Sequence, residues 1–189
     1  HLPVQSGNTE MLKRMNRGYS REWYLERIDA IRRILPTCSI STDLITGFCD
    51  ETEEEHADTI SMMNIVKWEF AYMYKYSERP KTLAERRYED NVPEEVKSAR
   101  LTEIINLQQE HSKMRHKKLV GSIQKVLVEG PSKREPESFM SGRADNNSKT
   151  VFPKGEFKKG TYVMVKINDC TTATLLGDVV EVLPPAKMN

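Results

Sequence analysis

The sequence has no long apolar run and few cysteines. A membrane-spanning helix needs about 20 consecutive apolar residues. No run in the 189 residues approaches that length, so we expect no contact with a membrane. No secretory signal segment is visible at the start. The three cysteines, Cys38, Cys49 and Cys170, are odd in number and far apart. They exclude a disulfide framework and favour a reducing compartment, which we expect to be the cytoplasm.

A metal site is also missing from the pattern of residues. The cysteines lack metal-ligand spacing, and the four histidines include no pair with zinc-like neighbours. His111 and His116 lie five residues apart in a polar helical stretch, where we expect a solvated surface. We therefore predict no metal ligands in this sequence.

The net charge of +1 hides two oppositely charged parts. Residues 1–110 carry 15 Lys and Arg against 20 Asp and Glu, whereas residues 111–189 carry 14 against 8. The first part is therefore acidic by five charges and the second is basic by six. Such asymmetry suggests a basic module that meets a polyanion, although many domains differ by a few charges by chance.

The first two thirds alternate between strand and helix patterns. Expected strands lie at residues 1–4, 38–48 and 69–76. Expected helices begin near the capping residues Asn8 or Thr9, Ser20 and Thr52, and at Pro93. On the helix after Thr52, the predicted inner face carries Ala57, Ile60, Met63 and Val66. This alternation predicts an α/β fold with a parallel sheet, of which about three units are present. Because a closed barrel needs more units, and because the chain does not begin with Met, we expect it to be part of a longer protein.

The pattern changes near Leu119 to short strands separated by Gly, Pro and Asn turns. Five strand candidates lie within residues 121–130, 139–146, 149–153, 161–169 and 172–183. About 70 residues of this kind predict a small antiparallel OB-like barrel. We place the domain boundary at the end of the long helix, giving an α/β domain at 1–117 and an all-β domain at 118–189.

Candidate ligand-binding residues follow the predicted parallel strands. In α/β folds, ligands bind at the carboxyl ends of the strands. There the sequence has Gln5 and Ser6, then Asp43 and Gly47, and then residues 76–79. Plain turns and hydrogen-bonded structural residues are the alternatives at these positions. Arg14 and Arg17 could hold a carboxylate, or could belong to a solvated helix end.

A second group of candidates lies in the basic C-terminal part. Cations with neutral amides suit phosphates and base edges. The group consists of Lys133, Arg134, Arg143, Asn146, Asn147 and Lys149. Phe139 and Phe152 could stack on an unpaired base, although a small barrel also needs Phe in its core. We favour RNA binding over an inert surface for this group.

Five blocks in order resemble one known family. They are HLPVQSGNTEMLKRMNRGYSREWYLERIDAIR, STDLITGF with ETEEE, YMYKYSERPKT, VPEEVKSARLTEIINLQ, and EGPSKREP with GRADNN. Together they resemble the C-terminal half of MiaB-type radical SAM tRNA methylthiotransferases, including the TRAM domain. The resemblance covers essentially the whole chain.

The resemblance implies half of a partial (β/α) radical SAM barrel followed by an OB-like TRAM barrel. It implies that the whole enzyme uses S-adenosyl-L-methionine and two 4Fe-4S clusters to methylthiolate carbon 2 of N6-isopentenyladenosine next to the tRNA anticodon. It further implies S-adenosylmethionine at Gln5, Ser6, Arg17, Asp43 and Gly47. The tRNA anticodon stem-loop would bind the TRAM domain, and the protein would be a monomer. The cluster motif CxxxCxxC is absent here, so the fragment should be inactive without the preceding part of the polypeptide.

Two alternatives remain. One is a sister methylthiotransferase that acts on threonylcarbamoyladenosine or on a ribosomal-protein aspartate, and the other is a non-catalytic tRNA-binding protein. The chain also departs from the family pattern at two loops. It has GFCDET at residues 47–52 where the family commonly reads GFPGET, and RPKT at residues 79–82 where the family reads RPGT.

Overall fold

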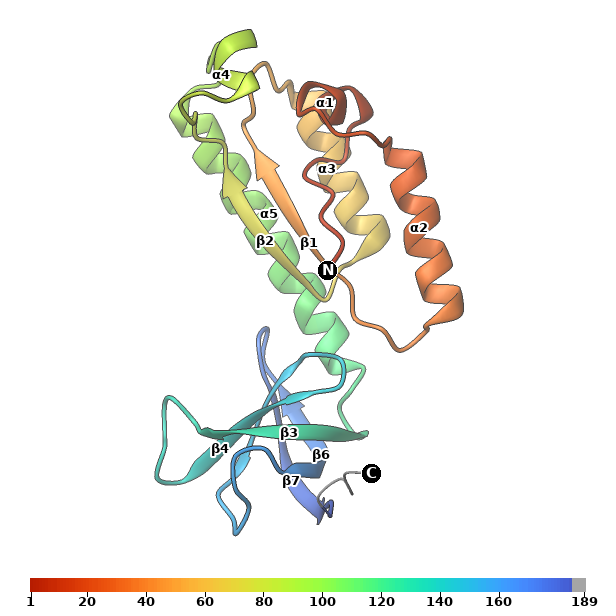
Figure 1. The fold of residues 1–189 in the computed structure, drawn as a ribbon, viewed down its shortest axis with the longest axis vertical. Coiled ribbons are helices and arrows are strands. Elements are labelled where there is room, and N and C mark those ends of the chain that lie inside the picture. Colours follow the sequence, from red (N-terminus) through yellow and green to blue (C-terminus); the bar gives the residue numbers. More distant parts are fainter. Residues whose placement is uncertain (185–189) are drawn as a thin grey trace. The chain divides into compact units, whose positions relative to one another are not determined.

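The computed structural model describes residues 1–184, which form two compact units (Figure 1). The division falls between His111 and Ser112, inside helix α5 (Glu94–Lys117), whereas the predicted boundary lies at residue 117. No helix within residues 1–184 combines the length and the apolar character that a membrane span requires.

The N-terminal unit is an α/β structure built on two parallel strands. Its elements are α1 (Thr9–Arg14), α2 (Arg21–Ile34), β1 (Ser41–Thr46), α3 (Glu53–Val66), β2 (Phe70–Lys75), α4 (Leu83–Arg87) and the first part of α5. Strand β1 pairs with β2 in parallel, from Ser41 opposite Phe70 to Thr46 opposite Lys75. The predicted parallel α/β fold is therefore confirmed. The predicted strand at residues 1–4 is instead an extended segment, joined to β1 by a parallel bridge between Gln5 and Leu44.

Side-chain caps define where the helices begin. Asn8 accepts the Met11 N–H, and Ser20 accepts the Trp23 N–H. Thr52 and Glu55 form the reciprocal capping box expected from the sequence. Helix α4 lies between the strand expected at residues 69–76 and the helix expected from Pro93, where the sequence analysis predicts no helix. Its signal was the Thr82 cap, which accepts the Glu85 N–H.

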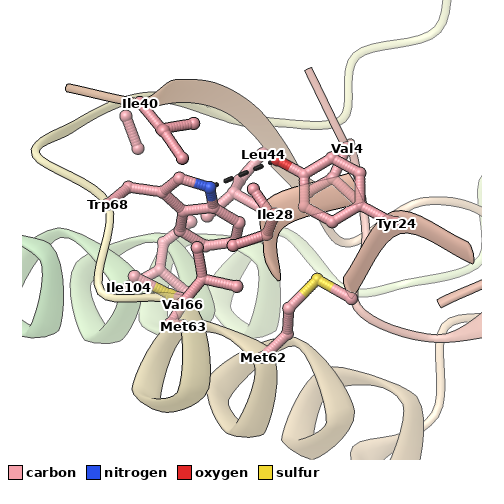
Figure 2. Close-up of a cluster of buried hydrophobic side chains, with 11 residues drawn as sticks. Val4, Tyr24, Ile28, Ile40, Leu44, Met62, Met63, Val66, Trp68 and Ile104 are labelled. Carbon is pink, nitrogen blue, oxygen red and sulfur yellow. Dashed lines mark hydrogen bonds between the residues drawn. The ribbon is translucent and has the colours of Figure 1, made fainter. Parts of the chain in front are cut away.

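The core of the N-terminal unit lies between the buried face of the sheet and helices α2, α3 and α5. Its buried residues are Val4, Tyr24, Ile28, Ile40, Leu44, Met62, Met63, Val66, Trp68, Ala71 and Ile104. Figure 2 shows Trp68 Nε1 donating to Tyr24 Oη within this cluster, at 3.2 Å. Tyr24 Oη donates in turn to the Leu2 carbonyl at 2.7 Å, which fixes the N-terminal segment.

Helix α3 buries a more polar face than predicted. Ala57 is exposed, so its predicted place on the inner face is wrong, whereas Thr59 is buried. The reason is that the backbone of residues 6–8 needs hydrogen-bond partners. Thr59 Oγ1 accepts the Gly7 N–H at 2.9 Å.

The C-terminal unit is a closed five-stranded barrel. Its strands are β3 (Ile123–Pro131), β4 (Phe139–Ala144), β5 (Lys149–Pro153), β6 (Tyr162–Cys170) and β7 (Leu175–Val182), in the order β3-β4-β5-β7-β6. Each strand coincides with one predicted candidate, and only β3 and β6 extend past theirs, by one residue each. The barrel is not wholly antiparallel, however, because β5 pairs with β7 in parallel. That pairing closes the barrel in the OB-like manner.

The two helical histidines are buried, which corrects the expectation of a solvated surface. His111 is 6% exposed and His116 is 7% exposed. Nδ1 of His116 lies 3.0 Å from the Thr171 carbonyl oxygen, so this nitrogen carries the proton and donates. The loop at Thr171 thus covers the end of α5, which the polar sequence of this helix did not indicate.

Candidate functional site

The two-stranded sheet leaves one face open. Along β1, Thr42, Leu44 and Thr46 are buried, while the alternating residues are only half-buried. The open face carries Ser41, Asp43 and Ile45 from β1, opposite Phe70, Tyr72 and Tyr74 from β2. The three aromatic side chains are about half exposed. We call these six residues the open face.

A cavity of about 440 Å³ lies where the open face reaches the carboxyl ends of the strands. Figure 1 shows α1 and α4 beyond the arrowheads of β1 and β2. The cavity is lined by Lys13, Arg14, Met15, Asn16, Arg17, Ile45, Phe48, Tyr76, Thr82, Leu83, Ala84, Arg87 and Tyr88. We call it the basic cavity, because its lining contains four cations and no carboxylate.

Two of the four cations have no counter-ion within residues 1–184. Arg14 is paired with Glu55 of α3, and Lys13 Nζ lies 2.7 Å from the exposed Glu10 carboxylate. Arg17 and Arg87 have no ion-pair partner in the described part of the chain, and both are exposed. Two unpaired guanidinium groups at one cavity favour an anionic ligand.

The lining of the basic cavity also contains three aromatic side chains. Phe48 contacts Tyr76 edge-on, with ring centroids 4.8 Å apart, and contacts Tyr88 at 6.0 Å. Burial, followed by the interaction with Cys49, raises the pKa of Tyr76 to about 12. Burial also raises the pKa of the Cys49 thiol. Cys49 is wholly buried and packs with Met11 and Phe48, so it fills space and is poorly suited to be a thiolate ligand.

The turn after β1 is held by a buried carboxylate. Gly47 has φ +70° and donates its N–H to Glu51 Oε2 at 2.6 Å. Arg100 Nη1 of α5 donates to the same oxygen at 2.9 Å. Burial raises the pKa of Glu51 despite these two donors. Its other oxygen, Oε1, has no hydrogen-bond partner within residues 1–184, which adds to the penalty for the charged form.

Two of the predicted cofactor-binding residues have accessible side chains. Arg17 lines the basic cavity. Asp43 lies on the open face, where its carboxylate is 3.4 Å from His1 Nε2 and 27% exposed. Both groups could reach a bound ligand.

The other three predicted cofactor residues are engaged with the protein. Ser6 is fully buried, and its Oγ accepts the Asn8 N–H and lies 3.4 Å from Thr59 Oγ1. The Gly47 N–H donates to Glu51 Oε2 and is therefore not available to a ligand. Gln5 is buried and has a φ of +74°. The structure therefore does not bring all five predicted residues to one accessible pocket.

In the C-terminal unit, four of the six predicted RNA-binding residues meet at the β4–β5 hairpin. Arg143 and Lys149 are directly opposed across the two strands. Arg143 Nη1 donates to the Asn147 carbonyl at 3.0 Å, and its Nε lies 3.8 Å from Glu129 Oε1. Asn146 Oδ1 accepts the Ser148 N–H, so its side chain shapes the turn.

Lys133 and Arg134 lie apart from that hairpin. They are exposed in the β3–β4 loop, at the other end of β4. A strand rises about 3.4 Å per residue, so the two groups are roughly 17 Å apart along β4. In OB folds, the second and third strands and the loop between the first and second strands bind oligonucleotides. Here these correspond to β4, β5 and the β3–β4 loop, so both groups fall on that surface.

The aromatic candidates in the barrel need correction. Phe152 is fully buried in the core and cannot stack on a base, while Phe139 is half-buried. Sequence reasoning missed Tyr162, which is 39% exposed and lies under Lys125 Nζ, 4.4 Å from the ring centroid. The alternation of residues 123–127 across from Tyr162 could have indicated this outward-facing pair.

No group of three His, Cys, Asp or Glu side chains in the described part of the chain could hold a metal ion. An iron–sulfur cluster therefore has no ligand set among residues 1–184. The cysteines Cys38, Cys49 and Cys170 are free thiols.

Comparisons with known proteins match both units. Residues 1–63 match the radical SAM superfamily, and residues 117–180 match the TRAM domain. The chain combines part of a radical SAM domain with a TRAM domain. Relatives named tRNA-2-methylthio-N(6)-dimethylallyladenosine synthase align with nearly all of it. The relative from Amoebophilus asiaticus is 54% identical over 95% of this chain and 37% of its own length. That from Christiangramia forsetii is 52% identical over 94% and 37%. That from Bacteroides fragilis is 48% identical over 95% and 39%.

The resemblance to MiaB-type methylthiotransferases is thus confirmed, and the chain spans a little more than a third of these relatives' length. The expected radical SAM part and TRAM barrel are both present. At both loops that depart from the family pattern, one residue has a positive φ. Asp50 and Lys81 stand where the family reads Gly, and they have φ values of +61° and +68°. The loops thus keep a left-handed backbone that favours glycine.

Proposed function

We propose that the whole protein is a tRNA methylthiotransferase that modifies N6-isopentenyladenosine beside the anticodon. The observation that carries this proposal is the joint match of a radical SAM part and a TRAM part in one chain with enzymes of that name. The N-terminal unit would contribute to the barrel that binds S-adenosylmethionine, and the C-terminal unit would bind the RNA. We further propose that the protein is cytoplasmic and monomeric.

For the cofactor, Arg17 and Asp43 are the residues that fit. The unpaired Arg17 guanidinium suits the carboxylate of S-adenosylmethionine, and the accessible Asp43 carboxylate suits its ammonium group or ribose hydroxyls. Ser6 and Gly47 would shape the strand ends, and the buried Gln5 would contribute from behind. When bound, S-adenosylmethionine with its 4Fe-4S cluster supplies radical chemistry, and a second cluster supplies the sulfur.

For the RNA, the proposal places the anticodon stem-loop on the β4–β5 surface and the β3–β4 loop. Lys133, Arg134, Arg143 and Lys149 would contact phosphates. Asn147, exposed at the hairpin turn, would contact base edges or the local RNA shape, with Asn146 holding that turn. The two groups of cations, roughly 17 Å apart, suit a ligand that extends along β4.

Nucleoside analysis of tRNA tests the enzymatic part of the proposal. Cells that lack the gene should lose 2-methylthio-N6-isopentenyladenosine and accumulate its unthiolated precursor. Loss of a methylthiolated threonylcarbamoyladenosine, or of a modified ribosomal aspartate, would instead identify one of the sister enzymes. An unchanged set of tRNA nucleosides and ribosomal proteins would favour a non-catalytic tRNA-binding protein.

A salt titration tests the RNA-binding part. The chain should bind an anticodon stem-loop with an affinity that falls steeply with salt, because phosphate contacts release counterions. The triple variant Lys133→Ala, Arg134→Ala, Arg143→Ala should lower the slope by about two to three. The matched control replaces the exposed Lys158, Lys159 and Lys166 with Ala and removes the same charge elsewhere on the barrel. Equal slopes for the two triple variants would exclude the proposed surface.

A further inference from the structure

The basic cavity has cations and aromatic side chains to which the proposed cofactor site assigns no role. Only Arg17 of its four cations is assigned to the cofactor. Arg87, at the end of α4, also lines this cavity and has no carboxylate partner within residues 1–184. An exposed arginine that lines a cavity without a counter-ion is suited to bind an anion.

The walls of the cavity are suited to an aromatic ring. Phe48, Tyr76 and Tyr88 form an edge-to-face cluster, and Met15, Ile45 and Leu83 add aliphatic surface. A volume of about 440 Å³ lies within the roughly 300–1,000 Å³ range of small-ligand sites. Unpaired nucleotides in RNA loops are recognised by aromatic stacking with an arginine or lysine on the phosphate.

The open face leads directly into this cavity. Ile45 belongs both to the open face and to the cavity lining, and it lies opposite Tyr74 on β2. Exposed Tyr72 and Tyr74 therefore extend the aromatic surface away from the basic cavity. Asp43, assigned above to the cofactor, lies opposite Tyr72 on this face, so the cofactor and the bound nucleotide would be neighbours.

We infer that the basic cavity binds one unpaired nucleotide of the RNA substrate, with Arg87 on its phosphate and Phe48, Tyr76 and Tyr88 around its base. This inference rests on the proposed function, because it takes the substrate to be RNA. It adds a second RNA contact, in the radical SAM part, to the one proposed for the barrel. Arg87 would act as a positioning residue that holds the loop near the cofactor.

The test compares neighbouring arginines on α4. Arg87 lines the cavity, whereas Arg86 is exposed and does not. With a fluorescently labelled anticodon stem-loop, Arg87→Ala should weaken binding about tenfold, the equivalent of one charge-assisted hydrogen bond. It should lower the salt slope by about one. Arg86→Ala, which removes the same charge from the same helix turn, should change neither quantity. Arg87→Lys should restore the slope.

Cross-linking tests the position of the base independently of charge. A stem-loop carrying 4-thiouridine at unpaired loop positions should cross-link on irradiation to peptides that contain Tyr76 or Tyr88. Cross-links confined to residues 118–184 would overturn the inference. Titration with S-adenosylmethionine alone separates the two possible ligands. If Arg87→Ala weakens cofactor binding and leaves RNA binding unchanged, the cavity belongs wholly to the cofactor and the inference is wrong.

The outcomes also separate this inference from the proposed function. If the barrel triple variant loses RNA affinity while Arg87→Ala behaves like Arg86→Ala, the inference fails and the proposed function stands. If the wild-type chain binds the stem-loop no better than unrelated double-stranded DNA, the RNA-binding proposal fails, and this inference fails with it.

Discussion

Glu51 Oε2 accepts the backbone N–H of Gly47 at 2.6 Å and so closes the turn after β1. The turn is tight, because a Cβ added at Gly47 would lie 2.3 Å from Lys97 Cγ. Lys97 cannot move away easily, since it is buried and its ammonium group is paired with Asp90.

Gly47→Ala should therefore destabilise the chain by about 2–4 kcal/mol, from the positive φ together with the steric overlap. Gly18→Ala is the matched control, because nothing lies within 4 Å of a Cβ added there and its φ is not positive. Urea unfolding of both variants measures the difference. Equal stabilities would show that the turn relaxes without loss.

The raised pKa of Glu51 predicts a specific pH dependence. Since burial raises the pKa of this carboxyl in the folded state, the folded chain holds its proton to higher pH than the unfolded chain does. The contribution of Glu51 to the free energy of unfolding should therefore fall as pH rises from the ordinary glutamate pKa, about 4.3, through the raised folded value. Glu51→Gln removes this contribution. The stability of the wild type minus that of the variant should decrease from pH 4 to pH 7; an increase would mean that Arg100 lowers the pKa instead.

The lysine at the family's glycine position predicts a stabilising substitution. Lys81 has a φ of +68°, which costs a side-chain-bearing residue about 1–2 kcal/mol, and glycine returns roughly 0.5–1 kcal/mol of this as unfolded-state entropy. Lys81→Gly should therefore raise the free energy of unfolding by up to about 1 kcal/mol. The Lys81 N–H donates to Glu85 Oε2 at 2.7 Å, and that bond is kept in the variant.

Asp50→Gly should not stabilise the chain in the same way. Asp tolerates the left-handed region better than Lys does. Asp50 also exchanges hydrogen bonds with Asn91, whose Oδ1 accepts the Asp50 N–H at 2.9 Å. Asp50→Gly would remove the second hydrogen bond, which Asn91 Nδ2 donates to Asp50 Oδ1. Thermal unfolding of both variants beside Lys81→Ala, which keeps the strain, checks the comparison; equal gains at both sites would contradict it.

The buried hydroxyl of Tyr24 predicts a marked loss in a conservative variant. Tyr24→Phe removes the acceptor of Trp68 Nε1 and the donor to the Leu2 carbonyl. Leaving buried polar groups unpaired should cost about 1–3 kcal/mol in the free energy of unfolding. Tyr74→Phe, at a half-exposed position, should cost little. Chemical denaturation of the two variants measures this difference.

Local sequence patterns predicted where the helices and strands lie, but they did not predict which side chains those elements bury. The caps at Asn8, Ser20 and Thr52 were readable because each bond lies within one helical turn. The burial of His116 depends on a barrel loop 55 residues away, which no local pattern contains. The parallel closure between β5 and β7 is likewise a long-range pairing, so turn spacing alone suggested an antiparallel barrel.

The sequence predicted that the candidate site lies at the carboxyl ends of the strands, but it did not predict which side chains there are accessible. Arg17 and Asp43 proved accessible, but whether Ser6 points outward depends on hydrogen bonds with Thr59 across the unit. The role of Arg87 was invisible in the sequence for a related reason. It lies on α4 and lines the cavity, and the sequence analysis predicts no helix at that position.

The contrast between closed and open strand edges has a practical consequence for handling the chain. The barrel pairs each of its five strands on both sides and leaves no free edge. Within residues 1–184, β2 pairs only with β1, so its outer edge offers unpaired backbone groups beside exposed Phe70, Tyr72 and Tyr74. Exposed apolar edges are where chains add to one another. In concentrated solution, aggregation should therefore begin at β2, and a charged residue in place of Phe70 should keep the chain dispersed without disturbing the barrel.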